Sequence, residues 1–208
     1  MPYIKNGREI YEHSFAIIRA EADLSGLPAD MQKVAVRMIH SCGMTDLAAD
    51  LRFDAELVAA ARGALRRGAP VLCDAEMIAS GITRKRLPAD NEIICTLNEA
   101  SVPELARRLG TTRSAAALEL WRERIEGAVV AIGNAPTALY RLFELLEAGW
   151  PRPAAVIGLP VGFVGAAESK AELAAGRAGV PFLTLAGRRG GSAMTVAAVN
   201  AIADEREI

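Results

Sequence analysis

Cysteine, histidine and excess charge are all scarce in this sequence, and each shortage excludes a class of function. The three cysteines, Cys42, Cys73 and Cys95, form no Cys-x-x-Cys pair and no His/Cys spacing that would hold zinc. Lys and Arg number 24 against 25 Asp and Glu, so the net charge is only −1. The chain therefore lacks the long-range attraction that nucleic acid or an anionic membrane would exploit. We expect reduced, buried thiols, no metal site and no nucleic-acid partner.

Long apolar runs and aromatic residues are also scarce. No run reaches the ~18 residues that a membrane span needs, and the first 14 residues are polar where a signal peptide would be apolar. We therefore expect a cytoplasmic protein with no membrane partner. Hydrophobic residues make up 51% of the chain but aromatic residues only 5%. The core must be built from Ala, Val, Ile and Leu, which suits helices packed on a sheet.

After residue 68, short apolar runs alternate with amphipathic segments. Runs without polar alternation predict strands buried on both faces, as in a parallel sheet; there are five, at Pro70–Cys73, Glu92–Leu97, Ala128–Ile132, Ala154–Gly158 and Pro181–Ala186. Helices are predicted between and after them at Ala75–Ala79, Pro103–Leu109, Arg113–Ile125, Pro136–Ala148, Ala166–Ala175 and Ser192–Ala203. We expect one α/β domain over residues 1–208, three-layered and doubly wound, with a mostly parallel five-stranded sheet.

Before the sheet, the sequence predicts a helix that ends in a histidine. Its buried face is indicated by residues at helical spacing: Met31, Val34, Ala35, Met38 and Cys42. Asp30 is expected to cap its start and Gly43 to end it in a left-handed conformation. Lys33, Arg37 and His40 stand at i, i+4 and i+7, so they form a second, polar stripe.

The position of His40 in the last turn suits proton transfer. The helix dipole favours the protonated ring there, whereas Arg37 and Lys33 on the same stripe disfavour it. A histidine between two opposing effects can titrate near neutrality and exchange a proton. From composition alone, a hydrogen-bonded or surface histidine is the simpler interpretation.

A preceding helix over Tyr11–Ala22 places Tyr11 and Ser14 one turn apart. We expect it to form a hairpin with the His40 helix, because the link between them contains Gly26 and Pro28. In such a hairpin Tyr11 and Ser14 would share a cavity with Arg37 and His40. The sequence leaves open that both are ordinary polar residues of a helix surface. 

Three of the predicted strands end in glycine-rich loops, at residues 133–136, 158–162 and 187–192. Ligands of doubly wound sheets bind at this edge, and loop N–H groups before a helix favour anions. Neither G-x-G-x-x-G nor G-x-x-x-x-G-K-[ST] follows any strand, so a nucleotide site is excluded. Each loop alone fits a tight turn, but together they favour a large polyanionic ligand. Arg113 at a helix start gains nothing from the dipole, which weakly indicates a ligand role, whereas Lys170 is expected to be structural.

Six segments together resemble the precorrin-8X methylmutase family of vitamin B12 biosynthesis over nearly the full length. They are MIHSCG (38–43), GITRKRLP (81–88), TTRSAAALELW (111–121), AIGNAPTAL (131–139), GLPVGFVGAAESK (158–170) and GRRGGSAMTVAAVNA (187–201). The resemblance implies a flavodoxin-like homodimer with no cofactor and no metal of its own. It implies an isomerase that moves a methyl group from C-11 to C-12 of precorrin-8X, giving hydrogenobyrinate.

The resemblance also implies roles for single residues. It makes His40 the catalytic acid/base and Ser14, Arg37, Tyr11 and Arg113 the substrate contacts. Residues 41–44, Ser-Cys-Gly-Met, favour the aerobic branch over a cobalt-precorrin-8 methylmutase of the anaerobic branch. A non-catalytic protein that binds tetrapyrrole carboxylates is the alternative from another functional class.

Overall fold

A mixed sheet lies at the centre of the computed structural model, which describes residues 3–207. Within that range the sheet has six strands in the order β1-β6-β5-β4-β2-β3. Their bounds are β1 Leu51–Phe53, β2 Val71–Cys73, β3 Ile93–Cys95, β4 Val129–Ile132, β5 Ala155–Gly158 and β6 Phe182–Leu185. All pairs are parallel except that of the edge strand β1, which runs antiparallel to β6 with Leu51 opposite Leu185. The predicted parallel strands are confirmed, but the expected count of five missed β1, in which the exposed Arg52 interrupts the apolar residues.

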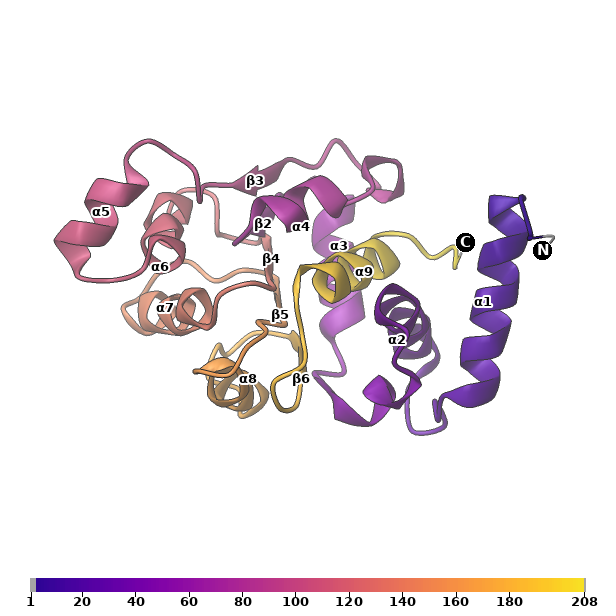
Figure 1. Ribbon diagram of the computed structural model, residues 1–208. Helices are drawn as coiled ribbons and strands as arrows, with labels where there is room; N and C mark the ends of the chain where they lie inside the picture. The colour runs from indigo at the N-terminus through magenta and orange to yellow at the C-terminus, as the bar shows by residue number, and fades with distance from the viewer. Residues whose placement is uncertain (1–2, 208) are drawn as a thin grey trace.

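Helices cover both faces of the sheet (Figure 1). One face packs on α2 (Ala29–Cys42), α3 (Leu57–Arg66), α4 (Glu76–Gly81) and α9 (Ser192–Ala203). The other packs on α7 (Pro136–Glu147) and α8 (Ala166–Ala174), with α6 (Arg113–Ala117) against α7 and α5 (Val102–Leu109) against α6. Neighbouring residues of one strand enter opposite cores, since Val129 belongs to the first core and Val130 to the second. Burial on both faces explains why the strands lack polar alternation.

Three short 3₁₀ helices link these elements: η1 (Thr45–Asp50), η2 (Arg84–Arg86) and η3 (Leu118–Trp121). The last of them falls inside the helix predicted over Arg113–Ile125, so that helix is shorter than expected. In residues 3–207 no helix is both long enough and apolar enough to cross a membrane. 

The predicted N-terminal hairpin is confirmed: α1 (Gly7–Glu21) lies along α2, which in turn packs on α9 (Figure 1). The side chain of Asn6 caps α1 by accepting from two N–H groups, so α1 begins four residues before the predicted start at Tyr11. Gly43 ends α2 at φ 72°, as expected. Asp30 is not the cap of α2, because the helix begins at Ala29 and Asp30 lies in its first turn.

A buried carboxylate at the end of β2 holds the loop between β4 and α7. One oxygen of Asp74 accepts from the Gly133 N–H at 2.9 Å, the other accepts from the Ala135 N–H at 2.8 Å, and the Asn134 N–H lies 3.1 Å from the second oxygen. Burial raises the pKa of Asp74, and these N–H donors oppose the rise. The N–H groups of this loop already have a partner within the chain, so the expectation that they bind a ligand is wrong here.

Replacing Asp74 by Asn is expected to destabilise the fold. The amide keeps one accepting oxygen but turns an NH₂ group toward backbone donors, which leaves buried N–H groups unpaired. We expect the free energy of unfolding to fall by about 1–3 kcal/mol, measured by urea denaturation. Asp54→Asn is the control: Asp54 accepts one local N–H ahead of α3, a role that Asn fills equally well. Equal stability of the two variants would contradict the proposed role of Asp74.

Candidate active site

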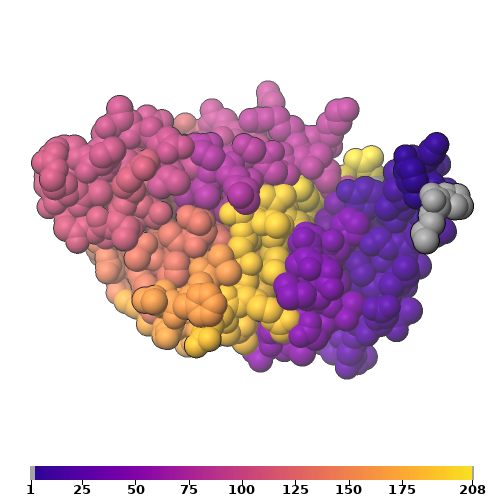
Figure 2. Space-filling view, in the orientation of Figure 1, coloured from indigo at the N-terminus to yellow at the C-terminus, as the bar shows by residue number. Residues whose placement is uncertain are grey.

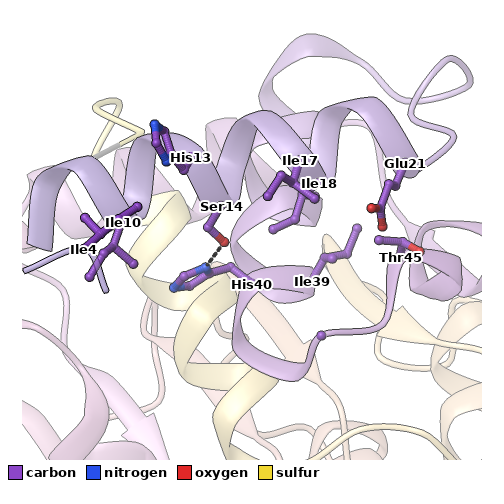
Figure 3. A pocket seen from close by; sticks show the side chains of 11 residues that line it. Ile4, Ile10, His13, Ser14, Ile17, Ile18, Glu21, Ile39, His40 and Thr45 are labelled. Atoms are coloured by element: carbon purple, nitrogen blue, oxygen red, sulfur yellow. Dashed lines mark hydrogen bonds between the residues drawn. The ribbon is translucent and has the colours of Figure 1, made fainter. Parts of the chain in front are cut away.

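The last turn of α2 and the middle of α1 form a pair of hydrogen-bonding side chains. Phe15 and Ile18 are the buried residues of α1, and they turn the neighbouring Ser14 toward the end of α2. The hydroxyl oxygen of Ser14 lies 2.7 Å from Nδ1 of His40 (Figure 3). The predicted proximity of Ser14 and His40 therefore follows from the apolar contacts between the helices.

Two aromatic rings hold the imidazole of His40. The Tyr11 ring lies 4.9 Å away between centroids, tilted by 33°. The Phe15 ring lies 5.3 Å away, edge to face at 82°. With Nδ1 bonded to Ser14, Nε2 has no hydrogen-bond partner within the described residues. The arrangement fixes the ring plane and leaves Nε2 as the nitrogen that can exchange a proton with a ligand.

An apolar groove of about 380 Å³ opens beside the Ser14–His40 pair. It is lined by Ile4, Ile10, His13, Ser14, Ile17, Ile18, Glu21, Ile39, His40, Gly43 and Thr45 (Figure 3). An apolar groove with a few placed polar groups is the usual form of a small-molecule site. The sequence analysis did not identify Ile10 and Ile17, which are 44% and 56% exposed. The sequence pattern that could have identified them is their spacing: they are seven residues apart, so they share one face of α1, and this face is not the buried one.

Burial and a neighbouring charge both act on the pKa of His40. Burial lowers the pKa of His40 below its ordinary value, and the nearby Arg37 guanidinium lowers it further. The neutral ring is therefore favoured at pH 7, and the protonated ring is a stronger acid than free histidine.

Arg37 lies next to this site but does not line the groove. Its guanidinium lies 5.7 Å from the Phe15 ring centroid and donates a hydrogen bond to the backbone oxygen of Glu207. Lys33 on the same stripe donates to the backbone oxygen of Glu205 at 3.2 Å. The polar stripe of α2 therefore faces the C-terminal segment 204–207. Both Lys33 and Arg37 contact the backbone of that segment.

Arg113 is separated from His40 within one chain. Its guanidinium donates to the backbone oxygen of Leu97 and to the side-chain oxygen of Asn98, both at 3.1 Å. It begins α6, which lies at the opposite end of the molecule from α1 and α2 (Figures 1 and 2). The structure thus brings together Tyr11, Ser14 and His40, with Arg37 beside them, but not Arg113.

Comparison with known proteins identifies the family of this chain. Residues 9–205 match the family model described as precorrin-8X methylmutase. The chain is 64% identical to a precorrin-8X methylmutase of Pseudomonas aeruginosa, covering 99% of both chains. It is 38% identical to a cobalt-precorrin-8 methylmutase of Priestia megaterium, covering 97% of this chain and 89% of the relative.

A solved structure shows the same fold. The crystal structure of a precorrin-8X methylmutase from Thermus thermophilus superposes with a TM-score of 0.85 at 40% identity, and 95% of each chain is covered. The sequence match spans the α1–α2 groove as well as the sheet. This chain therefore belongs to the precorrin-8X methylmutase family.

Proposed function

We propose that this chain is an isomerase that moves the methyl group of precorrin-8X from C-11 to C-12, producing hydrogenobyrinate without a cofactor. The observation that carries the proposal is a histidine with one free ring nitrogen, fixed by Ser14 at the edge of an apolar groove. The groove suits an apolar ring system, and the histidine suits the single proton that the rearrangement needs.

In the proposed mechanism the protonated ring of His40 gives its Nε2 proton to the macrocycle and becomes neutral. Protonation draws electron density from the conjugated system, so the migration terminus becomes electron-poor. The bond from the methyl group to C-11 then breaks as the bond to C-12 forms, and return of the proton to His40 fixes the product. No proton or electron is gained overall. Ser14 is placed to act through His40, since a hydroxyl oxygen that accepts from Nδ1–H keeps the proton of the neutral ring on Nδ1 and leaves Nε2 as the nitrogen that releases and takes back a proton.

The substrate carries acetate and propionate arms, and Arg37 is proposed to bind one of them. In the unliganded chain its partner is a neutral carbonyl, that of Glu207. A carboxylate forms a stronger, charge-assisted pair with a guanidinium, so it can replace this carbonyl. Tyr11, which is 38% exposed and whose ring is tilted over His40, is proposed to contact the macrocycle.

A contact between Arg113 and the same substrate requires two chains. One chain places α6 and α2 at opposite ends of the molecule (Figure 1), so Arg113 can reach a substrate beside His40 only from a second copy. The exposed apolar side chains of Ile10 and Ile17 on α1 support association at this end. We therefore propose a homodimer in which each site combines His40 of one protomer with Arg113 of its partner.

Sequence similarity supports the metal-free substrate of the aerobic branch. The chain is 64% identical to a protein named precorrin-8X methylmutase but 38% identical to one named cobalt-precorrin-8 methylmutase. The alternative is the cobalt-containing substrate of the anaerobic branch, in which the cobalt would belong to the substrate. Side-by-side conversion assays with the two substrates would separate these possibilities.

We propose that the chain works in the cytoplasm. Its cysteines Cys42, Cys73 and Cys95 are all unpaired, which suits a reducing compartment. Burial raises the pKa of the Cys95 thiol to about 11, so this cysteine stays in the unreactive thiol form at neutral pH.

Replacement of His40 by Ala is expected to abolish conversion but to preserve binding. Precorrin-8X would be incubated with each protein, and formation of hydrogenobyrinate followed by its absorption spectrum. We expect the wild-type chain to form product and His40→Ala to be at least 100-fold slower, since a general acid contributes ~10²–10⁴-fold. Titration with hydrogenobyrinate serves as the binding control. A wild-type chain that binds product but converts no substrate would instead be a tetrapyrrole-binding protein.

Replacement of Arg37 by Gln is expected to have two effects. Loss of the carboxylate contact should weaken substrate binding by roughly 1.5–3 kcal/mol. Because the charge of Arg37 lowers the pKa of His40, its removal should raise that pKa, so more of the ring is protonated at pH 7. NMR titration of the His40 ring would measure the shift. Lys33→Gln, on the same stripe but farther from His40, is the control; identical results for both variants would remove Arg37 from the site.

Mixing two inactive variants tests the two-chain site. In a heterodimer of His40→Ala and Arg113→Ala, one site carries both substitutions and the other carries neither. If protomers reassort randomly, half of the dimers are mixed and recover about a quarter of wild-type activity. If His40 and Arg113 acted within one chain, every mixed site would keep one defect and activity would not return. The readout is kcat/KM for precorrin-8X before and after mixing.

A further inference from the structure

The loop between β5 and α8 exposes two adjacent apolar side chains. Phe163 is 84% and Val164 89% exposed, more than any other large hydrophobic side chain of the described residues. Neither belongs to the two cores. Exposing them is unfavourable in water. A partner that covers both side chains would therefore gain the free energy of burying this apolar surface.

The backbone under these side chains is firmly held. The Gly162 N–H donates to the Arg188 oxygen at 3.3 Å, and the Gly191 N–H donates to the Leu159 oxygen at 2.8 Å. At Gly190 a side chain would place Cβ only 2.3 Å from the Leu159 oxygen, so only glycine allows the two loops to approach so closely. The exposed side chains therefore stand on a fixed base formed by the loops that follow β5 and β6.

A cation lies directly on the exposed aromatic ring. The Arg188 guanidinium is 5.3 Å from the Phe163 ring centroid, and Arg188 forms no ion pair with any acid in residues 3–207. The patch thus combines apolar side chains with an uncompensated positive charge. This combination fits a ligand that has an apolar face and a carboxylate at its edge.

The patch is continuous with Arg113 along the carboxyl edge of the sheet. A Cβ at Gly165 would lie 3.4 Å from Pro136, so this loop abuts the start of α7. The Thr137 hydroxyl, one residue further on, lies 2.8 Å from that of Thr112, the neighbour of Arg113. Arg113, like Arg188, has no acidic partner among the described ion pairs. Two cations therefore flank an apolar tip on one surface.

We infer that Phe163 and Val164 pack on the apolar face of the tetrapyrrole while Arg188 binds one of its carboxylate arms. This inference rests on the proposed function. In the proposed dimer, the position of Arg113 determines where Phe163 and Arg188 lie. If Arg113 of one protomer reaches the substrate beside the partner's groove, the continuous surface brings Phe163 and Arg188 with it. The macrocycle then lies between the His40 groove of one protomer and the Phe163 tip of the other.

Titration with hydrogenobyrinate tests this contact on full-length dimers. For Phe163→Ala/Val164→Ala we expect Kd to rise about 10- to 30-fold, with its salt dependence unchanged, because only apolar burial is lost. For Arg188→Gln we expect a rise of about tenfold and a weaker salt dependence, because a charged contact is lost. Phe163→Leu should restore most of the affinity. Leu109→Ala, which removes a 42% exposed side chain on α5, should change nothing.

The outcomes separate this inference from the proposed function. If the wild-type protein converts precorrin-8X but the double variant binds hydrogenobyrinate with an unchanged Kd, the inference alone is overturned. A double variant that becomes monomeric in sedimentation would also overturn it, since the tip would then be a contact between chains. If wild-type protein binds hydrogenobyrinate through Phe163 but converts no precorrin-8X, the contact stands and the proposed catalysis fails.

Discussion

The packing of α1 against the C-terminal half of α2 is the constraint on which the candidate site depends. Phe15 is buried between the helices, and its ring meets the imidazole of His40 edge to face. This one apolar contact sets the rotation of α1, which in turn brings Ser14 to Nδ1 and Tyr11 to the ring face. The polar geometry of the site is thus a consequence of hydrophobic burial, because the hydrogen bond alone would contribute only ~1 kcal/mol.

The C-terminal end of α2 is also tied to the sheet, through charged side chains in and around η1. Arg189, in the loop after β6, pairs with Asp46 and Asp50 of η1, which follows the His40 helix. The ammonium group of Lys170 donates to the backbone oxygen of Arg189. Burial lowers the pKa of Lys170 to about 8, yet the nearby Asp50 opposes that shift. Lys170 therefore holds the loop that bears Arg188, and Arg189 of that loop pairs with η1, which follows the helix that bears His40.

Sequence patterns predicted the structure correctly wherever it depends on residues that are close together in the sequence. Strands buried on both faces appear as unbroken apolar runs, and Gly43 ends α2 because a left-handed residue is needed there. The edge strand β1 carried no such signal, since its three residues follow a 3₁₀ helix directly. For the site, the shared face of Arg37 and His40 followed from helical spacing. The partner of Arg37, the backbone of Glu207, lies 170 residues away in sequence, so no local pattern predicts it.

The three-dimensional structure also changes the roles expected, from family resemblance, for two of the site residues. Ser14 was expected on the substrate, yet its hydroxyl lies against His40. Arg113 was expected in the same site, yet α6 and α2 lie at opposite ends of the molecule (Figure 2). A groove of about 380 Å³ that is open to solvent on one side provides one wall for a macrocycle and leaves its carboxylate arms uncovered. Because those arms need cations and the groove is lined by no Lys or Arg, the proposed site is complete only with a second surface that carries arginine.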